Sequence, residues 1–73
     1  MIRHISANRH EFNVRRMAEL NNEILEKELE LKNAQGFLNT FKIKNELRKL
    51  YKQINNHGEE VLEYEYSQLN EVN

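Results

Sequence analysis

The chain has 73 residues, a formal net charge of −1 and no cysteine. A chain of this length forms one domain, here 1–73, and buries only roughly 60% of the surface that its unfolded form exposes, so its core alone gives marginal stability. Because disulfides and cysteine-rich metal sites are excluded, we expect the core to be completed by a protein partner or by a second copy of the chain. The lack of cysteine also fits a reducing compartment, and we expect a cytoplasmic protein.

Hydropathy argues against a membrane location. The first residues contain no apolar stretch of the roughly 7 to 15 residues that a secretory signal needs, and nowhere do about 18 apolar residues follow one another. We therefore expect a protein that neither crosses nor enters a membrane. Asn is abundant and every acidic residue is Glu, a usage that we associate with a bacterial or phage accessory protein.

A first helix is predicted over residues 9–35. Asn8 is its expected N-cap, with Glu11 three residues later to complete a capping box. Apolar residues then recur at helical spacing, and Gly36 suits the left-handed conformation that often follows a helix end. The longer of two apolar seams on this helix consists of Met17, Leu20, Ile24 and Leu31.

A second helix is predicted over residues 40–56, followed by the stop signal Asn55-Asn56-His57-Gly58. Its apolar stripe is Ile43, Leu47, Leu50, Tyr51 and Ile54. The short connection around Gly36 predicts an antiparallel αα-hairpin. In the alternative, the first stripe continues through Gly36 to Phe41 as one helix of some forty residues, at a cost of only about 1 kcal/mol for the glycine. The stripe changes phase after Phe41, which favours the hairpin.

The last segment, 59–71, is predicted to be a third helix. Its apolar residues Val61, Leu62, Tyr66 and Leu69 fall on one side of a helix, although residues 62–66 also alternate as a strand would. Two glutamates at its start favour a helix N-terminus. The expected fold is therefore all-α: an αα-hairpin plus a third C-terminal helix, a small bundle completed by dimerisation.

Charge is distributed in four blocks. Residues 1–16 carry +3, residues 17–36 carry −3, residues 37–57 carry +4 and residues 58–73 carry −5. Consecutive blocks attract each other if the chain folds back on itself. The pattern supports the hairpin and predicts that the third segment lies against the second.

The first helix carries a second apolar seam, Val14, Leu25 and Leu29, about 100° away from the longer one. Two seams indicate a helix with two neighbours, and the hairpin partner supplies one. The other neighbour is either the third segment or another chain. We predict that the longer seam, Met17, Leu20, Ile24 and Leu31, is a protein interface, most simply between two copies of the chain.

Catalytic and metal-binding signatures are missing from the sequence. The histidines, His4, His10 and His57, share no metal-ligand spacing, and neither Ser6 nor Ser67 lies in a nucleophile-elbow context. Two isolated glycines cannot form a phosphate-binding loop. We therefore expect no enzyme, no cofactor, no metal and no small-molecule substrate.

Two functions remain. The first is a non-enzymatic interaction or regulatory protein, an adaptor or inhibitor that acts through apolar helix faces. The alternative is a small nucleic-acid-binding regulator that uses the second helix and a basic N-terminal arm. Lys44, Arg48 and Lys52 recur on one side of that helix with Lys49 nearby, and the arm consists of Arg3, Arg9, Arg15 and Arg16. A net charge of −1 and a pI of about 6.3 favour the first.

Overall fold

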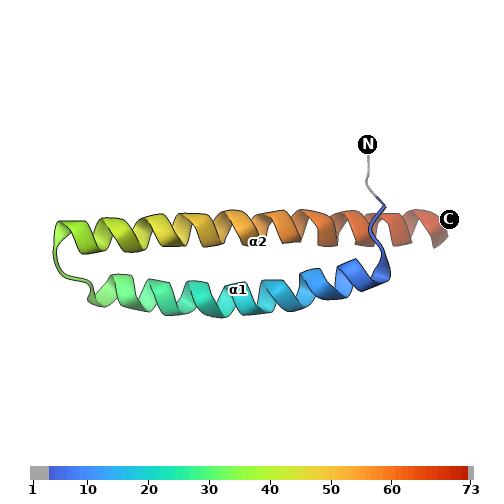
Figure 1. The fold of residues 1–73 in the computed structure, drawn as a ribbon. Coiled ribbons are helices and arrows are strands. Elements are labelled where there is room, and N and C mark those ends of the chain that lie inside the picture. The colour runs from blue at the N-terminus through green and yellow to red at the C-terminus, as the bar shows by residue number, and fades with distance from the viewer. Residues whose placement is uncertain (1–3, 73) are drawn as a thin grey trace.

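The computed structural model describes residues 4–72, and their side chains up to Leu69, as two long antiparallel helices (Figure 1). Helix α1 spans Ala7–Asn33 and helix α2 spans Phe37–Val72, with residues 34–36 between them. No strand occurs among the described residues. The predictions of an all-α fold and of a helical hairpin are confirmed.

Helix α1 begins earlier than predicted because a different residue caps it. Ser6 has extended backbone angles, and its Oγ accepts a hydrogen bond from the Arg9 N–H at 3.1 Å. A serine oxygen in this position satisfies one of the N–H groups that the first helical turn leaves unpaired. Asn8, the predicted N-cap, is already inside the helix.

The turn between the helices depends on Gly36, which has a φ of +89°. This backbone conformation is costly for any residue with a Cβ. The Gly36 carbonyl accepts hydrogen bonds from the Thr40 N–H at 3.1 Å and the Thr40 Oγ1 at 2.9 Å. Helix α2 therefore begins at Phe37 rather than at Thr40, and the alternative of one helix running through Gly36 is excluded.

The predicted helix end at Gly58, and with it a separate third helix over 59–71, is wrong. Helix α2 continues without interruption to Val72, and Gly58 has ordinary helical backbone angles. The reason is packing against α1: Val61 is half-buried, His57 is hydrogen-bonded to Asn13, and Tyr64 contacts α1 as well. Together these contacts outweigh the roughly 1 kcal/mol that a glycine costs inside a helix.

The core is a narrow strip between the helices. Ile24, Ile43 and Leu47 form a buried cluster, and Leu31, Ala34, Leu50 and Ile54 pack against it. Leu20 is fully buried one turn closer to the open end of the hairpin. Each of the leucine and isoleucine side chains contributes about 1.5 to 3 kcal/mol when fully buried, so a few residues carry most of the apolar contribution.

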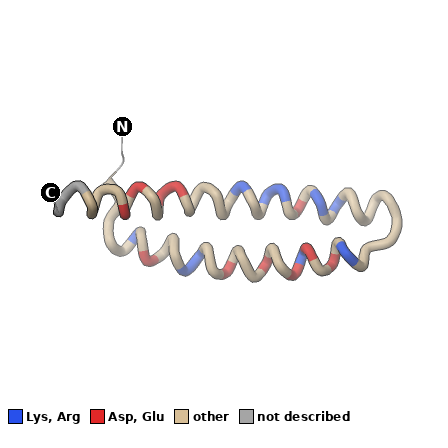
Figure 2. The backbone as a smooth tube through the Cα atoms, turned by 180° about the vertical axis from the view of Figure 1, so that it is seen from behind, with Lys and Arg blue, Asp and Glu red and all other residues tan. Residues whose placement is uncertain are grey.

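The antiparallel arrangement brings opposite charges together, as Figure 2 shows. The basic residues of α2 lie in the half near the turn, beside the glutamate-rich part of α1, and its acidic residues other than Glu46 lie toward the C-terminal end. Arg9 of α1 donates from Nε to Glu60 Oε1 at 2.8 Å and from Nη2 to Glu60 Oε2 at 3.2 Å. The charge blocks had predicted that the acidic C-terminal segment lies against residues 37–57. It lies along the start of α1 instead.

Candidate protein-interaction surface

The four predicted interface residues lie on the side of α1 that faces α2 within one chain. Leu20 and Ile24 are buried there, and Met17 and Leu31 are half-buried. The same chain therefore already covers most of this seam. The shorter seam, Val14, Leu25 and Leu29, is exposed, with 49%, 56% and 61% of the surface of these residues accessible.

A first apolar groove lies between the helices near the middle of α2. Met17 of α1 and Ile54, Gly58, Val61 and Leu62 of α2 line it. Because Gly58 has no side chain, the groove continues down to the Met17 methyl group, which lies 3.6 Å from where a Cβ would be. Leu62 stands at its edge with 67% of its surface exposed. The groove has the apolar lining that another protein's side chain needs.

A second groove lies nearer the turn. Leu31 of α1 and Leu47 of α2 form its floor, and Lys44, Arg48 and Tyr51 form its edge. The Tyr51 hydroxyl donates a hydrogen bond to Glu28 Oε1 at 3.4 Å. Partial burial of the ring, and then the charge and hydrogen bond of Glu28, raise the pKa of the Tyr51 phenol. The hydroxyl is therefore protonated at neutral pH and remains a donor.

Both grooves open on the same side of the hairpin. On α2, Tyr51 and Gly58 are seven residues apart, which is nearly two full helical turns. On α1, the separation between Met17 and Leu31 is twice as long, nearly four full turns, so these two residues also lie on one side of their helix. We call this side the apolar face and define it by Met17, Leu31, Tyr51, Ile54, Val61 and Leu62.

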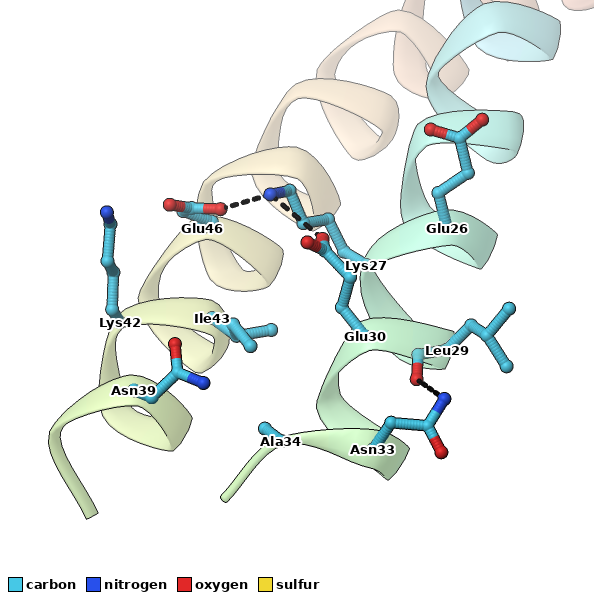
Figure 3. A pocket seen from close by; sticks show the side chains of 10 residues that line it. All are labelled: Glu26, Lys27, Leu29, Glu30, Asn33, Ala34, Asn39, Lys42, Ile43 and Glu46. Carbon is cyan, nitrogen blue, oxygen red and sulfur yellow. Dashed lines mark hydrogen bonds and ion pairs between the residues drawn. The ribbon is translucent and has the colours of Figure 1, made fainter. Parts of the chain in front are cut away.

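The opposite side of the hairpin carries many charged side chains, and a lysine on it is paired with two glutamates (Figure 3). The Lys27 Nζ lies 2.6 Å from a Glu46 carboxylate oxygen and 3.0 Å from one of Glu30. Hydrogen bonds to Glu46 and Glu30 raise the pKa of Lys27, and the hydrogen bond from Lys27 lowers the pKa of Glu46. We call this side the charged face and define it by Glu23, Glu26, Lys27, Glu30, Lys42, Glu46 and Lys49.

At the open end of the hairpin, a cluster of polar side chains lies between the two helices. Asn13 is fully buried, and its Nδ2 donates to Glu60 Oε1 at 3.1 Å. Its Oδ1 is then the acceptor, and it takes a hydrogen bond from His57 Nδ1–H at 2.8 Å. Every polar atom of the Asn13 side chain is thus engaged within the chain, which is how a buried amide is stabilised. This cluster holds the two helices together.

The four α2 residues of the nucleic-acid alternative are all exposed, but they do not share one surface. Lys44 and Arg48 lie at the edge of a groove on the apolar face, while Lys49 lines the charged face beside Glu23 and Glu46. Lys52 is exposed on α2. The structure therefore separates Lys49 from Lys44 and Arg48, and nucleic-acid binding through these residues stays a prediction.

Within the described part of the chain, no group of three or more His, Cys, Asp or Glu side chains is placed to hold a metal ion. Neither described helix contains a stretch apolar enough to cross a membrane. Comparisons of the chain with protein-family models, with curated proteins and with solved structures found no match.

The α2 part of the apolar face was missed at the level of sequence. Tyr51 was placed in the core stripe with Ile54, yet it is 43% exposed. The signal lies in the spacing: Tyr51 and Leu62 directly follow Leu50 and Val61 of the stripe that packs on α1, and with Leu69 they form a second stripe on α2.

Proposed function

We propose that this chain is a non-enzymatic protein-interaction module, an adaptor or inhibitor, that acts through its apolar face. The observation that carries the proposal is the contrast between the two sides of the hairpin. On the charged face, Lys27 is paired with Glu46 and Glu30, while the apolar face presents Leu62 and Tyr51 to solvent beside two grooves with apolar floors.

The chemistry of the apolar face fits another helix. Exposed apolar surface bordered by polar groups is typical of protein-binding sites, and a groove between two helices accepts the apolar side of a third. Asn55 and Glu59 border the first groove and Lys44 and Arg48 border the second, which provides a polar rim. Self-association is one form of this interaction, and a hairpin with so narrow a core gains stability from it.

The proposal is tested by affinity capture from cells that make the protein, with Leu62→Gln and Leu38→Gln as matched variants. Both leucines are exposed, at 67% and 80%, but only Leu62 belongs to the apolar face. We expect proteins captured by the wild type, including untagged copies of the chain, to be retained by Leu38→Gln and lost by Leu62→Gln.

Each sample is also treated with nuclease. Capture that is identical for all three chains would contradict the proposal. If capture were instead lost after nuclease treatment, and also lost in a variant with Lys44 and Arg48 substituted, the result would support the nucleic-acid alternative.

A further inference from the structure

Helix α2 carries a second seam, one position along from the stripe that packs on α1. Its members recur at alternating spacings of four and three residues, which is the pattern of helices that pack along their length. The seam consists of Lys44, Arg48, Tyr51, Asn55, Gly58, Leu62, Glu65 and Leu69. All of them except Gly58 are exposed, and several border the grooves of the apolar face. We call this set the outer seam.

Charge changes sign along the outer seam. Lys44 and Arg48 lie in the half of α2 near the turn, and Glu65 lies in the C-terminal half, with Glu59 adjacent to the seam (Figure 2). Among the described residues, no ion pair within 4.0 Å involves any of these four side chains. On the charged face, Lys27 is paired with Glu30 and Glu46. The outer seam therefore presents unpaired charges of opposite sign at its two ends.

We infer that the apolar face is occupied by a second copy of this chain, with the two α2 helices antiparallel along their outer seams; this inference rests on the proposed function. A two-fold axis that crosses α2 between Asn55 and Gly58 places Arg48 opposite Glu65 of the second copy and Tyr51 opposite its Leu62. Symmetry repeats each contact, as expected for an isologous interface.

Charge decides the direction of the helices. In the antiparallel arrangement the basic half of each outer seam faces the acidic half of the other. A parallel arrangement would place Arg48 against Arg48 and Glu65 against Glu65, and like charges facing each other disfavour association. Near the axis, Asn55 lies opposite Gly58 of the second copy, where the missing side chain leaves room for the amide. A polar residue in such a seam favours one alignment over others.

The length difference between the helices agrees with this arrangement. Figure 1 shows that α2 extends past the beginning of α1, so the last turns of α2 have no helix beside them. Tyr66 and Leu69 in these turns are 52% and 66% exposed. In the antiparallel dimer these turns lie along residues 41–48 of the second copy, with Leu69 over the aliphatic part of Lys44.

The inference is tested by sedimentation equilibrium of the full chain at low salt, with circular dichroism to confirm folding. We expect a reversible dimer. Arg48→Glu or Glu65→Arg alone should raise the dissociation constant about tenfold, because each creates two repulsive contacts. The double variant R48E/E65R should return it to the wild-type value. Lys49→Glu makes the same charge change on the charged face and should alter the constant by less than about twofold.

Because the chain has no cysteine, single introduced thiols report the alignment independently. Under mild oxidation, Asn55→Cys should form a disulfide-linked dimer much faster than Asn56→Cys, which points away from the outer seam.

Failure of the double charge variant to recover the wild-type dissociation constant, or equal cross-linking of both cysteine variants, would overturn the antiparallel alignment. If the wild type stayed monomeric at high micromolar concentration, the inference that a second copy occupies the apolar face would be wrong. If Leu62→Gln still abolished capture of another protein in that case, the proposed function would stand.

Discussion

The two halves of the hairpin are held together by different chemistry. Near the turn, the apolar side chains of Ile24, Ile43 and Leu47 fill the space between the helices. At the open end, the fully buried Asn13 bonds to His57 and Glu60 instead. Apolar contacts stabilise but tolerate small shifts, whereas hydrogen bonds require particular atoms to meet. In the turn half the apolar cluster therefore supplies stability, and in the open half the hydrogen bonds select which residues of α1 and α2 lie opposite each other.

The largest effect is expected in the turn half, from Ile24→Glu. The residue is only 6% exposed, and a carboxylate placed there has no partner, which costs about 3 to 5 kcal/mol. This is comparable with the whole stability of a domain of this size, so the protein should unfold. The next residue provides the control: Leu25→Glu, at a position 56% exposed, should keep its helicity by circular dichroism. Equal helicity in both variants would show that Ile24 does not lie in the core.

In the open half, Asn13→Ala should lower the free energy of unfolding by about 1 to 3 kcal/mol, because His57 and Glu60 each lose a hydrogen-bond partner. The measurement is urea denaturation followed by circular dichroism. Asn21→Ala, at an exposed position of the same helix, is the matched control and should change the free energy by less than about 0.5 kcal/mol. If both variants lowered the free energy of unfolding by similar amounts, the hydrogen bonds of Asn13 would not have the role proposed for them in the open half.

The two glycines, one in each half, should respond in opposite directions. Gly36→Ala should destabilise the protein by about 1 to 2 kcal/mol, because alanine is strained at a φ of +89°. Gly58→Ala should stabilise the monomer by up to about 1 kcal/mol, since a helical alanine there meets only the Met17 methyl group at an ordinary 3.6 Å. Thermal unfolding at low protein concentration compares the two. If Gly36→Ala raised the unfolding temperature, the turn would not depend on the positive φ of Gly36.

The smallest effect is a pH dependence in the turn half. The pKa of Glu46 is lowered by its hydrogen bond from Lys27, so its contribution is present above the ordinary glutamate value of 4.5 and is lost as the pH falls through the folded value. The pKa of Lys27 is raised, so its contribution is present below 10.5 and is lost as the pH rises through the folded value. We expect the urea midpoints of wild type and Lys27→Met to differ between these limits and to converge in acid. If the difference between the two urea midpoints persisted in acid, the contact between Lys27 and Glu46 would not be the source of that difference.

Periodicity and one glycine were enough to predict the hairpin. The core residues Ile24, Ile43 and Leu47 all recur at helical spacing, and Gly36 marks the turn. The end assigned at Gly58 was wrong because that signal is local, whereas the contact that overrides it, between Asn13 and His57, joins residues far apart in the sequence.

The two apolar seams of α1 show the same difference between local and long-range signals. Both seams of α1 are apolar at helical spacing, so hydropathy does not tell which one faces α2. The alignment of the helices decides this, and it depends partly on Asn13, a residue that any hydropathy scale assigns to the surface. The apolar face could have been found from the second stripe on α2, because Leu62 and Leu69 lie seven residues apart.

The central claim is that contacts with other molecules form on the apolar face and not on the charged face. Amide NMR spectra of the isotope-labelled wild type test it directly, recorded from low to high protein concentration and again with any protein recovered by capture. We predict that the signals of Tyr51, Val61 and Leu62 shift or broaden while those of Glu23, Glu26 and Lys49 stay in place. Changes that are largest on the charged face would contradict the account.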